Sequence, residues 1–194
     1  MEERRQKIID AAKALFSEKG YAGTGLREIA ERAGVSLGNI YNYFKNKEEI
    51  FRSIFNPEEI GGTLVESFKH IAGDFPHNIS DVILSIKQTV DNNIDLYRLY
   101  YIDLIEFGGR NTNIVYEYFL TLGKSLFREQ LDRKILDGSL KDLDFDFLSK
   151  QFLITMISFF SSIHVLPALR IDNYTDKEMS GIIADVLLHG ITKK

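Results

Sequence analysis

The fold is decided by the stretch from Leu26 to Lys47, which reads LREIAERAGVSLGNIYNYFKNK. Apolar residues recur at helical spacing in its first half and stop before Gly34, a residue type that commonly ends helices because glycine readily adopts positive φ. Ser36 is a favourable N-cap, so a second helix is predicted from about Leu37 to Phe44. Two short helices joined by a tight glycine-containing turn indicate a helix-turn-helix, whose second helix enters the major groove of DNA.

The outward face of this second helix lacks the charged residues of an ordinary surface helix. It carries Gly38, two asparagines (Asn39 and Asn42) and two tyrosines (Tyr41 and Tyr43). A glycine costs about 1 kcal/mol in a helix, but it lets the backbone approach another surface closely. Asparagine amides pair with base edges, most naturally adenine, and tyrosine hydroxyls suit phosphate oxygens. The residue types on this face therefore favour contact with DNA.

Positive charge follows this helix at Lys45 and Lys47. Asn46 and Glu49 have the spacing of a capping box, so a further helix is predicted to begin at Lys47. Its N-terminus would offer free N–H groups and the positive end of a dipole to a phosphate. Lys47 would add a full charge at the same place.

Residues 4–51 resemble the DNA-binding domain of the TetR family of transcriptional regulators. The resemblance lies in the AxxLFxxxGY run from Ala12 to Tyr21, in Thr24 ahead of the IAxxAGVSxGxIYxYF run, and in Lys47. It implies an all-α protein with an N-terminal three-helix helix-turn-helix domain at 1–50, whose connecting helix begins at residue 47. A C-terminal helical domain for effector binding and dimerisation is expected at 51–194.

Residues on and around the helix-turn-helix are expected to contact DNA. Asn39, Tyr41, Tyr43 and Lys47 are expected to make the main contacts. The other members of this set are Thr24, Arg27, Ser36, Leu37, Gly38, Asn42 and Lys45. The Thr24 hydroxyl has a second interpretation as the N-cap of the first of the two helices, and Arg27 is equally compatible with an exposed structural arginine.

Composition limits the class of protein. The 194 residues contain no cysteine, which excludes a disulfide framework and a thiolate metal site. The N-terminus does not read as a signal peptide, and no apolar run approaches the ~18 residues of a membrane span, so a cytoplasmic protein without membrane contact is expected. The net charge is −4, yet residues 1–50 carry nine basic and eight acidic residues. This slight local surplus suits specific, reversible DNA binding.

The rest of the chain reads as helix, without strands or repeats. A first amphipathic helix is predicted at Glu2–Lys19, where Arg4 and Arg5 either reach DNA or belong to a frayed terminus. The helix from Lys47 is expected to end near Asn56 or to be kinked at Pro57. Further helices are predicted over about 63–73, over about 79–107, from Thr112 to Leu136, from Phe147 to about Leu166, and after a cap at Thr175.

The two C-terminal helices are more apolar than one small bundle requires. Such surplus is often buried against a second copy, and two-fold dimers are the commonest oligomers. A homodimer through these two helices, which the family resemblance also implies, would place two recognition helices about 34 Å apart on palindromic double-stranded DNA.

Aromatic residues are concentrated in the middle helices and are compatible with a small-molecule pocket, although core packing is the favoured interpretation of any single one of them. The family resemblance implies a small effector, which this composition suggests is lipophilic. The candidate lining residues are Asn93, Tyr97, Tyr101, Phe107, Tyr116, Phe119, Phe152, Met156 and Phe159, with Asp103, Glu106 and His164 as further polar anchors. The alternative for His164 is a hydrogen-bonded histidine in the core.

No residue pattern indicates an enzyme. The four histidines lack metal-ligand spacing, and there is neither a phosphate-binding glycine loop nor a nucleophile motif, so no catalytic residue, metal or cofactor is expected. The family resemblance therefore implies a transcriptional regulator, expected to be a repressor released from its operator by an effector. The alternative is a DNA-binding architectural or cell-division protein whose C-terminal domain binds a protein partner.

Overall fold

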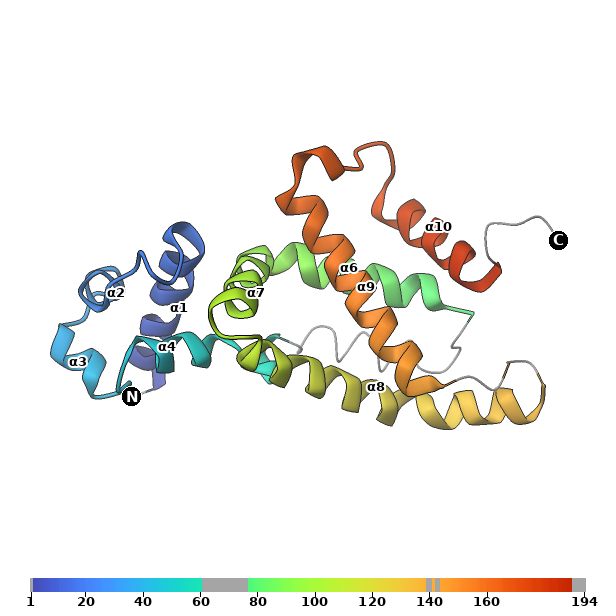
Figure 1. The fold of residues 1–194 in the computed structure, drawn as a ribbon, viewed down its shortest axis with the longest axis horizontal. Coiled ribbons are helices and arrows are strands. Elements are labelled where there is room, and N and C mark those ends of the chain that lie inside the picture. Colours follow the sequence, from blue (N-terminus) through green and yellow to red (C-terminus); the bar gives the residue numbers. More distant parts are fainter. Residues whose placement is uncertain (1, 61–76, 139–140, 142–143, 190–194) are drawn as a thin grey trace. The chain divides into compact units, whose positions relative to one another are not determined.

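The computed structural model describes residues 2–60, 77–138, 141 and 144–189. Every regular element in these residues is a helix, which confirms the all-α prediction (Figure 1). The elements are α1 (Glu2–Lys19), α2 (Leu26–Ala33), α3 (Leu37–Tyr41), α4 (Lys47–Ile54), α6 (Ile79–Asn92), α7 (Ile94–Glu106), α8 (Arg110–Leu136), α9 (Phe145–Val165), the 3₁₀ turn η2 (Pro167–Leu169) and α10 (Asp176–His189). None of the helices in the described part of the chain is both long and apolar enough to cross a membrane.

The chain divides into two compact units. The first contains the described residues of Met1–Ile60 and of Asp95–Glu117, so helix α7 belongs with the N-terminal helices. The second contains the described residues of Gly61–Ile94 and of Tyr118–Lys194.

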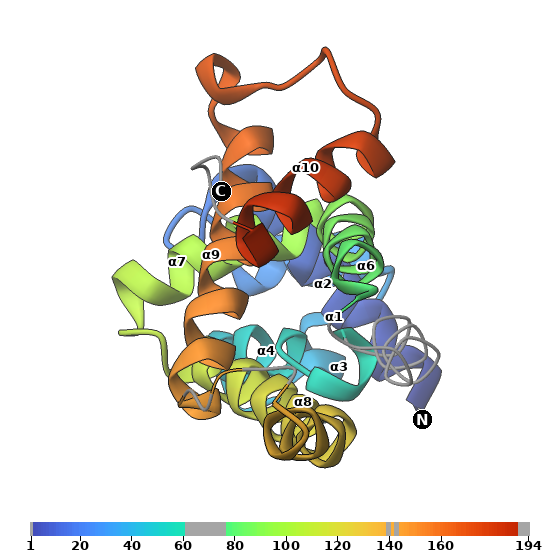
Figure 2. The same cartoon turned by 90° about the vertical axis from the view of Figure 1, so that its right-hand side faces the viewer.

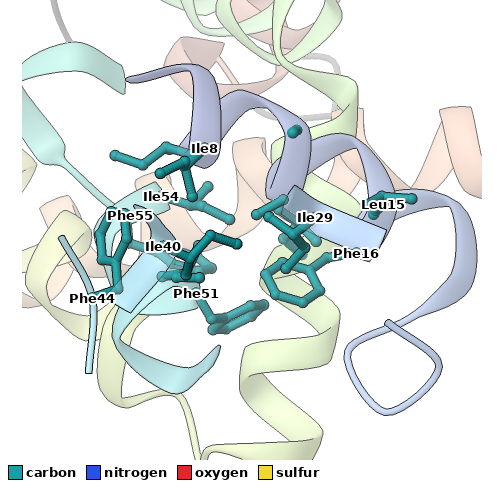
Figure 3. Packing of buried hydrophobic residues seen from close by; sticks show 14 of the residues in the cluster. Ile8, Leu15, Phe16, Ile29, Ile40, Phe44, Phe51, Ile54 and Phe55 are labelled. Carbon is teal, nitrogen blue, oxygen red and sulfur yellow. The ribbon is translucent and has the colours of Figure 1, made fainter. Parts of the chain in front are cut away.

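The core of the first unit is built by the apolar stripe of α1. Ile8 and Phe16 lie on this stripe and meet Ile29 of α2, Ile40 of α3 and Phe51 of α4, all with 0 % exposure (Figure 3). Residues spaced three or four apart share one helix face, so α1 can contact three short helices at once. Leu96 and Leu99 of α7 complete the same cluster. The short helices are therefore held mainly by packing, because isolated helices of this length are unstable in water.

The N-terminal helices begin and end close to the predicted positions. Helix α4 stops at Ile54, and residues 57–60 are helical again after a break at Phe55 and Asn56. The Asn56 side chain accepts a hydrogen bond from the Glu58 N–H (3.2 Å), and Pro57 takes the first helical position, where its missing N–H is harmless. The chain thus ends one helix and starts another. The pattern predicted over 63–73 lies outside the described residues.

The prediction of one long helix over 79–107 is wrong. Helix α6 ends at Asn92, and Asn93 leaves the helical conformation with φ −128° and ψ 30°. The backbone N–H of Asn93 donates to the Val90 carbonyl (3.0 Å), and its side-chain amide donates to the Thr89 carbonyl (2.9 Å). Asparagine competes with the backbone in this way, which favours helix ends. The apolar spacing continues across the break, so periodicity did not reveal it.

The later helices start slightly earlier than predicted. Helix α8 begins at Arg110 rather than Thr112, and α9 begins at Phe145, where the carboxylate of Asp144 accepts the Phe147 N–H (3.0 Å). The cap at Thr175 is confirmed: its hydroxyl accepts the Glu178 N–H (3.3 Å), and the Glu178 carboxylate accepts the Thr175 N–H (2.8 Å).

Helix α6 packs against α9 and α10 in the second unit (Figure 2). A charged cluster joins the three helices: the Lys87 ammonium lies 2.6 Å from an Asp91 oxygen and 2.9 Å from an Asp176 oxygen. The other Asp91 oxygen lies 2.7 Å from His164 Nε2. His164 is therefore hydrogen-bonded, but its side chain is 35 % exposed rather than in the core. Burial opposes the charged form of Lys87, but the two carboxylates outweigh it and raise its pKa.

Candidate nucleic-acid interface

The turn between α2 and α3 fixes the angle of the helix-turn-helix through backbone bonds. Gly34 adopts a left-handed conformation with φ 67° and ψ 32°. Its N–H donates to the Glu31 carbonyl (3.1 Å), and the Val35 N–H donates to the Ala30 carbonyl (2.9 Å). This pair of bonds is a Schellman motif, which requires positive φ at the glycine position. The Ser36 hydroxyl then accepts the Asn39 N–H (3.2 Å), as expected of the N-cap of α3.

Helix α3, the recognition helix, is shorter than predicted. It ends at Tyr41, and Asn42 and Tyr43 form a turn rather than a continuation of the helix to Phe44. The N–H groups of Tyr43 and Phe44 both donate to the Ile40 carbonyl, at 3.0 and 2.9 Å. Ile40 and Phe44 are buried in the core on either side of this turn.

The face of α3 opposite these two residues is open to solvent. Tyr41 is 56 % exposed, Gly38 and Asn42 are exposed, and Asn39 is half-buried. The Asn42 amide lies 3.5 Å from the Asn39 side-chain oxygen, so the two amides are neighbours on one surface. The structure therefore brings together the predicted base-reading residues. Ser36 is exposed beside them, whereas Leu37 and Tyr43 are half-buried at the border of this surface.

Gly38 has no structural reason to be glycine within the fold. A Cβ atom built there would meet only the Ser36 hydroxyl, at 3.9 Å, which is ordinary contact. Its φ is not in the left-handed region, since positive φ is confined to other glycines of the described chain. Such a glycine leaves the backbone bare on the exposed face of α3, where another surface can approach it closely.

Thr24 does not cap α2, so that interpretation is wrong. The N-cap of α2 is Gly25, which makes no side-chain cap bond. Thr24 is 2 % exposed, and its hydroxyl donates to the carbonyls of Leu15 (3.2 Å) and Gly20 (2.9 Å) at the end of α1. Its side chain is thus used to hold the loop. Arg27, by contrast, is exposed on the first turn of α2.

Lys45 and Lys47 have different surroundings. Lys45 is exposed, and its backbone N–H donates to the Glu49 carboxylate (2.6 Å). Asn46 caps α4 by accepting the Glu49 N–H (2.8 Å), so the predicted cap is confirmed, although Glu49 returns its bond one residue earlier than in a standard capping box. Lys47 is half-buried, and its ammonium donates to the carbonyls of Tyr21 (2.7 Å) and Thr24 (2.8 Å).

The two arginines at the start of α1 also differ. The Arg5 guanidinium donates to the Ser53 hydroxyl (3.3 Å) and lies 5.3 Å from the centre of the Phe44 ring. Arg5 on α1 therefore contacts both α4 and Phe44, which lies between α3 and α4. Arg4 is exposed on α1, which is helical from Glu2 onward.

The candidate effector residues fall into both units. Tyr97, Tyr101, Phe107 and Tyr116 belong to the first unit, and Asn93, Phe119, Phe152, Met156 and Phe159 belong to the second. In the first unit, Tyr100 joins its neighbours into a tyrosine cluster, with ring centres 5.2 Å from Tyr101 and 6.3 Å from Tyr116. Burial raises the pKa of Tyr97 and Tyr116 well above the usual range, so both phenols are neutral donors.

One of the expected polar anchors, Asp103, has a structural role. Asp103 is 0 % exposed, and its carboxylate accepts the backbone N–H groups of Asn111 (3.1 Å) and Thr112 (2.8 Å) together with the Asn111 amide (2.7 Å). It therefore caps α8 and is fully engaged, contrary to the role of an effector anchor. Glu106 is exposed. No group of acidic and histidine side chains in the described residues has the arrangement of a metal site.

Helix α10 presents an apolar surface in the second unit. An open groove of about 450 Å³ runs along it, lined by Tyr174, Glu178, Gly181, Ile182, Asp185 and Val186. Ile182 and Val186 are 49 % and 44 % exposed, and Leu187 and Leu188 are similarly open. Exposed aliphatic side chains on one helix are typical of a surface that another protein covers.

The helix-turn-helix and the chain around it are similar to known transcriptional regulators. Residues 8–54 match the family model described as bacterial regulatory proteins, tetR family. The fatty acid metabolism regulator protein of Bacillus subtilis is 33% identical over 147 residues, which cover 74% of this chain and 68% of the relative. The HTH-type transcriptional regulator AcrR of Shigella flexneri is 36% identical over 90 residues, or 45% of this chain and 42% of AcrR, so that match spans less than half of the relative.

Solved structures share the fold over nearly the whole chain. The transcriptional regulator FadR from Bacillus subtilis, in complex with stearoyl-CoA, superposes with a TM-score of 0.73 and 24% identity, covering 96% of this chain and 99% of that one. FadR from Bacillus halodurans gives a TM-score of 0.76 at 23% identity, covering 98% and 97%. At these identities the likeness establishes the fold.

Proposed function

The chain belongs to the TetR family of transcriptional regulators, and from this premise we propose that it binds DNA sequence-specifically through the exposed face of α3. The observation that supports this most directly is Gly38, which nothing in the fold requires. A bare backbone flanked by the Asn39 and Asn42 amides suits close approach to base edges in the major groove. Ser36, Tyr41 and Tyr43 surround these amides and offer hydroxyl groups to phosphates.

The flanking groups of the proposed interface come from neighbouring elements. Arg27 on α2 and Lys45 before α4 are exposed and carry positive charge. Leu37 begins α3 and is half-buried, so its contact would be apolar, and Thr24 would act through the loop rather than through its own buried side chain. Phosphate contacts of this kind orient a helix on the duplex, while base contacts set the sequence preference.

A homodimer would supply the second recognition helix. The apolar groove on α10 supports association through the C-terminal helices, since Ile182, Val186 and their neighbours gain from burial. One recognition helix covers only a few base pairs, so two copies would double the site. The expected operator is a palindrome with half-sites about 34 Å apart.

The effector is proposed to be a long-chain acyl-CoA, and the protein a repressor that this effector releases from DNA. Support comes from the relative that regulates fatty acid metabolism and from the stearoyl-CoA bound by a protein of the same fold. The many aromatic and apolar candidates, including Phe119, Phe152, Met156 and Phe159, suit an acyl chain. Release requires only that the effector bind better to a dimer geometry that does not fit DNA.

The decisive experiment is selection of random duplex DNA by the purified protein, followed by sequencing of the retained fraction. A palindrome with half-sites one turn apart is the expected result. Adding stearoyl-CoA to the complex should then release the DNA, whereas free CoA, the matched control, should not. Retention of no sequence above background contradicts the DNA-binding proposal, and release by neither compound contradicts the effector class alone.

A further inference from the structure

The ammonium group of Lys47 is embedded in the loop that precedes α2. It donates to the carbonyls of Tyr21 (2.7 Å) and Thr24 (2.8 Å), and it lies 4.2 Å from the centre of the Tyr21 ring. A lysine ammonium has three N–H donors. Two of them are used by carbonyl oxygens, and the aromatic face occupies a further side of the cation. One N–H of this ammonium is therefore left for a phosphate.

The position of Lys47 in the helix makes these contacts significant. Lys47 is the first residue of α4, where the helix dipole disfavours a positive charge and favours acidic residues such as Glu48 and Glu49. Charge-assisted hydrogen bonds to two carbonyls offset that unfavourable location. Within the folded protein, the carbonyls of Tyr21 and Thr24 are therefore the groups that stabilise the Lys47 charge.

The loop is held from both sides. The Thr24 hydroxyl donates to carbonyls at the end of α1, and the Thr24 carbonyl accepts from Lys47 at the start of α4. Helix α2 begins at Leu26, two residues after this pinned position. Since α2 contacts α3 directly, displacement of the loop would tilt the pair of helices together.

We propose that Lys47 is a positioning residue, which fixes the helix-turn-helix on α1 and α4, rather than a direct phosphate contact. This inference rests on the proposed DNA binding and reverses the role expected from the sequence. Lys45 provides the contrast: it is two residues away, has the same charge, and its side chain is exposed.

The dependence of DNA affinity on salt distinguishes the two roles. Each phosphate that a lysine neutralises contributes about 0.9 to the slope of log affinity against log salt concentration. The operator affinities of the wild type, Lys47→Met, Lys47→Arg and Lys45→Met are measured from about 50 to about 200 mM salt, each on operator and on random duplex. Circular dichroism establishes a temperature at which all four are folded.

A positioning role predicts a distinct pattern for Lys47→Met. Its operator affinity should fall about tenfold or more at every salt concentration with an unchanged slope, and its preference for operator over random duplex should shrink. Lys47→Arg, which keeps a donor for the loop carbonyls, should recover most of the preference. Lys45→Met should instead lower the slope by about 0.9 for each phosphate that is no longer neutralised, and it should weaken both duplexes alike.

Three results would overturn the proposal. The first is a smaller salt slope for Lys47→Met than for the wild type, and the second is an unchanged operator affinity of this variant. The third is a lower melting temperature of Lys47→Met while the folded variant keeps its full preference for operator over random duplex. Amide hydrogen exchange of the free protein gives an independent measurement: exchange at residues 21–26 should be faster in Lys47→Met than in the wild type. Unchanged exchange refutes the anchoring even if no operator is recovered, whereas a missing operator refutes only the DNA-binding proposal.

Discussion

The ring of Phe107 stacks on the ring of Phe51, with their centres 4.8 Å apart and 22° between their planes. Tyr21 meets Phe107 edge to face at the same distance. Residues from the loop after α1, from α4 and from the bend after α7 therefore share one aromatic cluster. These contacts tie α7 to the helices that carry the recognition helix, within one compact unit. Phe107 therefore has a packing role that its candidacy as an effector contact did not include.

Removing this ring should destabilise the first unit. We expect Phe107→Ala to lower the free energy of unfolding by about 2–4 kcal/mol, because it deletes a half-buried aromatic contact and leaves a cavity. Urea unfolding followed by circular dichroism measures the change. Ile105→Ala, two residues away and 83 % exposed, is the control and should change stability by less than about 0.5 kcal/mol. Equal effects of the two substitutions would contradict the packing role.

Gly38→Ala should separate stability from DNA binding. The new methyl group meets nothing closer than 3.9 Å, so the fold should keep or gain stability, by up to about 1 kcal/mol of helix propensity. Operator affinity should nevertheless fall about tenfold or more, because the methyl group holds the backbone away from the bases. Thermal melting and fluorescence anisotropy on the selected operator measure the two effects. Undiminished affinity would remove the main support for the proposed interface.

Asn39→Ala should relax base preference. Loss of an amide that pairs with a base edge is expected to weaken the free energy of binding to the operator by about 1–3 kcal/mol. The loss should be much smaller on a duplex in which the contacted base pair has already been changed. Affinity is compared across a set of single-base operator variants. Tyr43→Phe serves as the comparison, since loss of a phosphate contact should weaken all duplexes equally. A uniform loss for Asn39→Ala as well would refute its base-reading role.

Ile182→Glu should break the proposed dimer. A carboxylate in the apolar groove of α10 would be buried without a partner on association, which is strongly unfavourable. Analytical ultracentrifugation should show monomers, and binding to the full palindrome should fall towards that of a single half-site. Ile105→Glu makes the same change on an exposed isoleucine of the first unit and should leave the sedimentation unchanged. A dimeric Ile182→Glu protein would place the interface elsewhere.

Lys87→Met should destabilise the second unit by about 1–3 kcal/mol, since Asp91 and Asp176 lose their shared cation. The pKa of Lys87 is raised in the folded protein, so its contribution is complete below its ordinary value of 10.5 and declines as pH rises through the higher folded value. The difference in unfolding free energy from wild type should thus be constant between about pH 8 and pH 10 and shrink at higher pH. A difference that grows at high pH would contradict this sign.

The helix-turn-helix could be predicted because its caps and its turn depend on hydrogen bonds between residues close in sequence. Gly34, Ser36 and Asn46 act through bonds to backbone groups within a few residues, so their roles could be inferred from the sequence and are confirmed. The same is true of the Thr175 cap. The all-α class followed from apolar spacing together with the family resemblance.

Errors arose where a side chain has a partner distant in sequence. The Thr24 hydroxyl donates to carbonyls at the end of α1, and His164 bonds to Asp91 in another helix. The Lys47 ammonium likewise has partners 23 and 26 residues earlier in the chain, while its expected contact with DNA stays a prediction. Periodicity carries no information on such pairs. At Asn93 the signal was local, but continuous apolar spacing outweighed it. The contacts expected of Arg27 and Lys45 with DNA stay predictions.

The recognition helix separates two kinds of residue on its opposite sides. Ile40 and the following Phe44 lie in the core, while Gly38, Tyr41 and Asn42 are exposed. Substitutions on the outer side can therefore accumulate without loss of the folded state. Under the proposed mode of DNA binding, a lineage carrying this scaffold can acquire new operators by changing a few of these surface residues, so its regulatory targets can diverge faster than its architecture.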